Sequence, residues 1–150
     1  MEQKINKKIA ANIGHIKEEN LELTREAFCE RARKNAEYIG DDYFGSLFGI
    51  TFEAGKEELF ALMKALSNIW TEGSGIVMDY ATEEYEGDAK TRYEYFEMEH
   101  LLSECGFRIY EHLDNTEAED QLFYQHNLIK PRKQIKPPKG VCYCLAVRKW

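Results

Sequence analysis

The sequence has no apolar run that could cross a membrane. A spanning helix needs about 20 consecutive, mostly apolar residues, and no stretch of the chain approaches that length. Basic residues occur within Met1–Lys8, but the apolar region of a secretion signal does not follow them. We therefore expect a cytoplasmic protein that does not contact membranes.

Cysteines are few, and their spacing fits neither a disulfide framework nor a zinc site. No Cys-x-x-Cys pair is present. Cys142 and Cys144 are two residues apart, so in a strand they face the same side, about 6.5–7 Å apart, too far for an unstrained disulfide. We expect reduced, buried cysteines and no metal. A Cys-His nucleophilic pair that uses His112 or His100 is the alternative.

The chain has fewer basic residues than acidic ones. The chain has 20 Lys and Arg residues against 27 Asp and Glu, a net charge of -7, which disfavours a protein whose main task is to bind nucleic acid. Proline is scarce too, and all three prolines lie in Leu128–Lys139 together with five basic residues. We interpret that stretch as a solvated connection, with a phosphate contact as the alternative.

A short apolar run, Ile76–Asp79, is the clearest structural signal in the chain. Its pattern is typical of a strand that is covered on both faces, as in the parallel sheets of α/β domains. Helical patterns precede it at Leu59–Trp70 and follow it at Tyr95–Cys105. Asp79 and Tyr80 then fall at the carboxyl end of the strand, where ligands bind in open α/β sheets.

With 150 residues, the chain is long enough for one packed core and too short for two ordinary domains. We therefore expect residues 1–150 to form a single α/β domain. In Phe107–Leu113, the residues Phe107, Ile109, Glu111 and Leu113 should share one face of a strand, with Glu111 as the imperfect position. The other expected elements are a brief strand at Asn12–Ile16, a helix at Asn20–Tyr38 with Asn20 as its N-cap, a buried strand in Tyr43–Phe52 that runs into a tight loop, a short helix at Thr116–His126, and a last strand at Val141–Val147.

Two glycines interrupt the aromatic stretch Tyr43–Phe52. Gly45 and Gly49 let the backbone approach a neighbour closely. A turn or bulge is one interpretation, and a loop that lines a ligand is the other.

Several stretches, in this order and spacing, resemble the carboxyl-terminal half of the leucine carboxyl methyltransferase-like family of class I S-adenosylmethionine-dependent methyltransferases. Together they cover about two-thirds of the chain. The segments are Phe44–Leu59 (FGSLFGITFEAGKEEL), Gly73–Tyr80 (GSGIVMDY), Tyr93–His112 (YEYFEMEHLLSECGFRIYEH), Gln121–Asn127 and Val141–Lys149 (VCYCLAVRK).

This resemblance implies a partial class I methyltransferase sheet of the Rossmann-like type, mostly parallel with an antiparallel last strand and with helices on both faces. It also implies methyl transfer from S-adenosyl-L-methionine to an oxygen or carboxylate of a small molecule. Phe44, Ser46 and Gly49 are then the residues near the cofactor, and Asp79 and Tyr80 are those near the substrate.

The chain also departs from the family pattern. Such enzymes hold the cofactor with a glycine-rich turn after the first strand and an acid after the second, and no strand, Gly-x-Gly turn and helix occurs before Asn20. Phe48 stands where many members carry an acid. We expect a truncated enzyme that is weak or inactive alone. The alternative is a non-catalytic remnant or interaction module that pairs through an open sheet edge, as a homodimer or with a complementing amino-terminal half.

Overall fold

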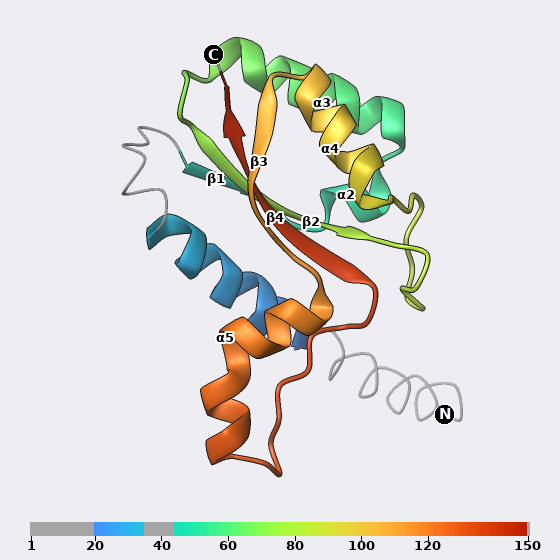
Figure 1. The fold of residues 1–150 in the computed structure, drawn as a ribbon. Coiled ribbons are helices and arrows are strands. Elements are labelled where there is room, and N and C mark those ends of the chain that lie inside the picture. Colours follow the sequence, from blue (N-terminus) through green and yellow to red (C-terminus); the bar gives the residue numbers. More distant parts are fainter. Residues whose placement is uncertain (1–19, 35–43, 150) are drawn as a thin grey trace, which may run out of the picture.

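The computed structural model describes residues 20–34 and 44–149 (Figure 1). Residues 20–34 form a helix, drawn in blue, that carries no label in the figure. The labelled elements are β1 (Phe44–Leu47), α2 (Ile50–Glu53), α3 (Lys56–Ile69), β2 (Gly75–Ala81), α4 (Tyr95–Glu104), β3 (Phe107–Leu113), α5 (Asn115–Ile129) and β4 (Val141–Arg148).

The four strands form one mixed sheet in the order β1-β2-β4-β3. β1 pairs with β2 in parallel, and β4 lies antiparallel between β2 and β3. Three strands therefore run in one direction and β4 runs against them. This confirms the expected α/β class, the interior position of Ile76–Asp79 and the antiparallel last strand.

Helices cover both faces of the sheet (Figure 1). On one side, α3 and α4 pack on the strands, and Met78 and Tyr80 of β2 belong to that core. On the other side, the helix of residues 20–34 and α5 pack on Val77 of β2. We call these the α3–α4 face and the α5 face. All seven residues of β2 are buried, as the sequence predicts for a strand covered twice.

Local signals explain where the helices around β2 begin and end. Glu58, in the first turn of α3, accepts a hydrogen bond from the N–H of Gly55 just before the helix, which satisfies one of the free donors of that turn. α4 is followed by Gly106 with φ of 87°, the left-handed conformation that often ends a helix. The sequence predicted both helices.

β3 departs from its predicted alternation because it contains a β-bulge. Ile109 lies opposite Ala146 and Glu111 lies opposite Leu145, so Tyr110 is the extra residue. Phe107 and Ile109 pack on the α3–α4 face, whereas Leu113 packs on the α5 face. The prediction that all four alternate residues share one face is therefore wrong, because one inserted residue reverses every side chain that follows it.

Four other features differ from the prediction. β1 is half-buried rather than buried, because it lies at an edge of the sheet that the described strands form. Residues 50–53 form a helical turn instead of extending that strand. Asn20 already lies inside its helix, and α5 continues to Ile129, beyond the predicted end at His126. Asn12–Ile16 lies outside the described residues, as do residues 35–38 and Tyr43.

Close approach explains the first glycine of the Tyr43–Phe52 stretch. A Cβ atom on Gly45 would lie 2.6 Å from the Trp70 ring, so the glycine makes room for that ring. Among the described helices, none has both the length and the apolar character needed to cross a membrane.

Candidate functional site

The loop that follows β1 turns sharply at Gly49. Its φ of 83° lies in the left-handed region that glycine adopts without strain. The N–H of Gly49 donates a 2.8 Å hydrogen bond to Oδ1 of Asp79 on β2. The glycine thus lets the loop between β1 and α2 bend towards β2 at the carboxyl ends of the two strands.

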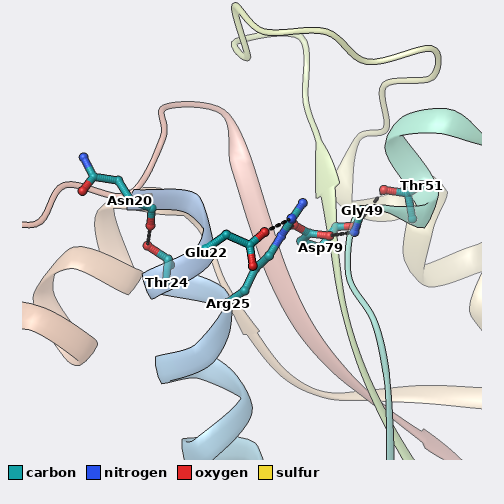
Figure 2. A network of polar contacts seen from close by, with 7 residues as sticks. All are labelled: Asn20, Glu22, Thr24, Arg25, Gly49, Thr51 and Asp79. Carbon is teal, nitrogen blue, oxygen red and sulfur yellow. Dashed lines mark hydrogen bonds and ion pairs between the residues drawn. The ribbon is translucent and has the colours of Figure 1, made fainter. Parts of the chain in front are cut away.

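Asp79 is the centre of a network of polar contacts (Figure 2). It has no exposed surface. Its Oδ2 accepts a 2.6 Å hydrogen bond from Nε of Arg25, and its main-chain oxygen accepts one of 2.6 Å from Oγ1 of Thr51. Arg25 also pairs with Glu22 at 2.8 Å. The network therefore connects the helix of residues 20–34, β2 and α2.

The charges in this network stabilise each other away from water. Burial raises the pKa of the Asp79 carboxyl above its ordinary value of 3.8, while Arg25 and the Gly49 N–H act to lower it. Burial also acts to lower the pKa of Arg25, but the net shift is upward because of Asp79. The guanidinium carbon lies 5.9 Å from the ring centroid of Phe48 and 5.7 Å from that of Phe52, so cation–π attraction adds to the ion pair.

The other two residues expected near the cofactor lie along β1, apart from this network. Ser46 is exposed in the strand. Phe44 is half-buried, and its ring centroid lies 5.2 Å from the guanidinium carbon of Arg33. Of the residues that the sequence grouped as a site, the structure brings Gly49 and Asp79 into contact.

Tyr80, the second residue expected near the substrate, points to the opposite face of the sheet from Asp79. Its hydroxyl lies 2.7 Å from Nε2 of His112 on β3. Burial is the main reason why the pKa of Tyr80 is raised and that of His112 is lowered. Both groups are therefore neutral at neutral pH, and the sheet separates them from the charged network around Asp79.

The Cys-His alternative finds no support in this arrangement. Cys142 and Cys144 are free and buried on the same face as Tyr80, as their spacing predicts. Burial raises the pKa of the Cys142 thiol to about 11, whereas an attacking thiol must be largely ionised. His112 is bonded to Tyr80, and the ring of His100 is exposed and lies near Glu104.

The sequence reasoning missed Arg25, although a signal for it exists. Arg25 follows Leu21 by four residues and precedes Phe28 by three, so it lies on the apolar face of its helix. Its side chain is only 13% exposed. A cation on a buried face requires an acidic partner, and Asp79, the acid within the most buried strand, was the candidate.

The described residues do not by themselves fit S-adenosylmethionine. The polar groups at the carboxyl ends of β1 and β2 are bonded to one another, since Asp79 accepts from Gly49 and Arg25. The aromatic rings of Phe48 and Phe52 pack beside that guanidinium. Within residues 20–34 and 44–149, no group of three or more His, Cys, Asp or Glu side chains could hold a metal ion.

Comparisons with known proteins find similar structures but no sequence match. No protein-family model and no curated protein matches the chain. The solved structures include a magnesium protoporphyrin IX methyltransferase from Synechocystis with bound SAH, at 12% identity and TM-score 0.46 over 73% of this chain and 45% of that one. They also include an S-adenosylmethionine-dependent methyltransferase from Clostridium acetobutylicum, at 12% identity and TM-score 0.45 over 71% of this chain and 57% of that one. The chain thus spans about half the length of these two proteins.

Proposed function

We propose that the chain is the carboxyl-terminal part of an S-adenosylmethionine-dependent methyltransferase that resembles the leucine carboxyl methyltransferase-like family. Its methyl acceptor is an oxygen or carboxylate of a small molecule. The observation that carries the proposal is the position of β4, antiparallel between β2 and β3. The antiparallel direction of β4 supports the resemblance that the sequence segments indicate, because the resemblance implies an antiparallel last strand.

The contribution of the described residues to such a reaction is positional. Methyl transfer depends mainly on holding two reacting atoms in line, with a base where the acceptor is not ionised. Asp79 and Gly49 fix the loop after β1 against β2, and Arg25 fixes the adjacent helix to the same point. Groups outside the described residues must then hold most of the cofactor.

A second candidate function is a non-catalytic interaction module. Two observations favour it. The polar groups around Asp79 are already bonded to one another. The edge strand β1, with the sequence FGSL, carries no charge and no proline. Within the described part of the chain, β1 pairs with β2 alone. An uncharged edge with free backbone groups is a site for strand pairing with another chain.

A melting experiment on the full chain with S-adenosylmethionine tests whether a complete cofactor site is present. A ligand at a hundred times its Kd stabilises a protein by about 2.7 kcal/mol, which is several degrees for a domain of this size. We expect a shift below about one degree at millimolar S-adenosylmethionine, with ATP as the control for non-specific effects. A rise of several degrees that Ser46→Ala or Asp79→Ala abolishes would show that the chain holds the cofactor alone.

The coding sequence upstream of Met1 separates the two candidates. A reading frame there that encodes a strand, a glycine-rich turn and a helix supports the methyltransferase, and the longer product should bind S-adenosylmethionine. If the longer product also fails to bind, or if no frame encodes such a segment, the interaction module is the better description. Light scattering then tests the module, since strand pairing through β1 predicts dimers.

A further inference from the structure

A cavity of about 300 Å³ lies between the loop that follows β2 and the segment that precedes β4. We call these the β2–α4 loop (residues 82–94) and the strap (residues 130–140). Pockets for small ligands start at about this volume. The cavity lining includes Leu21, Tyr85, Gly87, Lys136, Pro138 and Lys139.

Arg92 holds the β2–α4 loop in one shape. Its Nη1 donates hydrogen bonds to the main-chain oxygens of Thr82 at 3.0 Å and of Tyr85 at 2.5 Å, and its Nη2 donates to that of Gly87 at 3.1 Å. One planar guanidinium thus satisfies three carbonyl groups of a single loop. Arg92 therefore holds the cavity wall that carries Tyr85 in shape without a bound ligand.

The Tyr85 ring is fixed from two sides. It packs edge-to-face on Phe52, with ring centroids 5.4 Å apart, and Phe52 in turn lies beside the guanidinium of Arg25. A Cβ atom on Gly87 would lie only 2.3 Å from the Tyr85 hydroxyl oxygen. Glycine at position 87 is thus required for the observed ring position, and the ring connects the cavity to the Asp79 network.

Hydrogen bonds join the strap to the β2–α4 loop. Thr82 donates two hydrogen bonds to the Gly140 oxygen, from its N–H at 2.8 Å and from Oγ1 at 3.0 Å. A Cβ atom on Gly140 would lie 2.2 Å from the Tyr85 main-chain nitrogen. Further along the strap, Asn127 exchanges two hydrogen bonds with the backbone of Ile135, at 2.7 and 3.0 Å. Hydrogen bonds thus hold the strap against the β2–α4 loop at Gly140 and against α5 at Ile135.

The chemistry of the lining specifies a ligand class. Leu21, Pro138 and the Tyr85 ring give the cavity an apolar lining. The charged residues of the lining are two cations, Lys136 and Lys139, and one acid, Glu86. We propose that this cavity binds the methyl acceptor, and that the acceptor is a small molecule with an apolar body and one carboxylate. This assignment rests on the proposed methyl transfer, and it names the substrate class for the same end of the sheet.

Binding of cinnamate, compared with the uncharged cinnamamide, tests the proposal on the full chain without S-adenosylmethionine. NMR titration should show saturable binding of cinnamate, with shifts at Tyr85 and Gly87. The pair of substitutions Lys136→Gln and Lys139→Gln should weaken cinnamate about fivefold, because exposed charge pairs contribute less than about 1 kcal/mol each, and should leave cinnamamide unchanged. Gly87→Ala should weaken both ligands, because it displaces the Tyr85 ring.

The matched control is the pair Lys130→Gln and Lys133→Gln, which removes two exposed cations of the same strap that do not line the cavity. It should leave cinnamate binding at the wild-type value. Equal loss in both pairs, equal affinity for the acid and the amide, or no saturable binding at millimolar ligand overturns the proposal. Because cofactor is absent, a failure of S-adenosylmethionine binding leaves this result intact. Cofactor binding without cinnamate binding overturns only the acceptor assignment.

Discussion

Asp79 and Tyr80 are neighbours on β2 that point to opposite faces of the sheet and have no exposed surface. On the α5 face, the carboxyl of Asp79 is held by a guanidinium and a backbone N–H. On the α3–α4 face, the phenol of Tyr80 is held by the imidazole of His112. One strand thus buries a charge on one side and a neutral pair on the other. We therefore expect the free energy of unfolding to fall more when Asp79 loses Arg25 than when the Tyr80–His112 bond is lost, because an unpaired buried charge costs far more than an unpaired neutral group.

The largest effect is expected from Arg25→Met. It leaves the Asp79 carboxyl buried without its cation, which should lower the free energy of unfolding by about 3–5 kcal/mol. Urea denaturation measures this loss. Adding Asp79→Asn should recover part of it, because no buried charge then remains.

Glu22→Gln is the matched control for that substitution. Glu22 pairs with the same arginine, but its side chain is 62% exposed, so its removal should cost less than about 1 kcal/mol. An Arg25→Met variant that loses no more stability than Glu22→Gln would show that the α5 face does not depend on this ion pair.

A smaller effect is expected from Tyr80→Phe. It removes one hydroxyl and leaves Nε2 of His112 without that partner, at a cost of about 1–2 kcal/mol in urea denaturation. The control is Tyr95→Phe, because the Tyr95 hydroxyl is bonded to the exposed Glu99 and its loss should change stability by about 0.5 kcal/mol or less. Equal losses in the two variants would mean that the Tyr80–His112 bond contributes no more than a surface contact.

The smallest effect is expected in the pH dependence of the same pair. Burial lowers the pKa of His112 below its ordinary value of 6.5 in the folded protein, so the unfolded chain takes up a proton first as pH falls. The stability contributed by the neutral ring is complete above about pH 6.5 and is lost as pH falls through the folded-state pKa. The stability difference between the wild type and His112→Gln should therefore shrink as pH falls from about 7 to about 5.

For Asp79, burial shifts the pKa in the opposite direction, upward. Its raised folded-state pKa means that folding favours the protonated carboxyl relative to the unfolded chain, so the stability from that form is complete below the ordinary pKa of 3.8 and declines as pH rises through the folded-state pKa. For His112, a stability difference between the wild type and His112→Gln that stays constant between about pH 7 and about pH 5 would contradict the neutral Tyr80–His112 pair.

Most of the fold could be predicted from the sequence, because its signals are local. β2 is marked by a short apolar run, α3 by apolar residues at helical spacing, and the end of α4 by Gly106. The antiparallel β4 followed from the family resemblance. The bulge at Tyr110 could not be predicted, because the alternating pattern reads equally well without an inserted residue and only the partner strand reveals the shift.

The site was less predictable, because it depends on contacts between distant segments. Asp79 was singled out by its place at the end of β2, and Gly49 by the flexibility of glycine. Their contact could not be read from local pattern, and the partner Arg25 is 54 residues away in sequence. Tyr80 was assigned to the same crevice because it is adjacent in the chain, whereas adjacent residues of a strand face opposite sides.

The extra residue at Tyr110 reverses the alternation of side chains between the two faces of β3. Before Tyr110, the odd-numbered residues Phe107 and Ile109 pack on the α3–α4 face. After it, the odd-numbered residues Glu111 and Leu113 lie on the α5 face. Glu111 thereby reaches Arg31 at 2.6 Å on the α5 face, and His112 reaches Tyr80 on the other. An alignment that matches β3 to a regular strand without a gap would place every residue after Tyr110 out of step, and a polar-substitution scan should show the sensitive positions change parity at that residue.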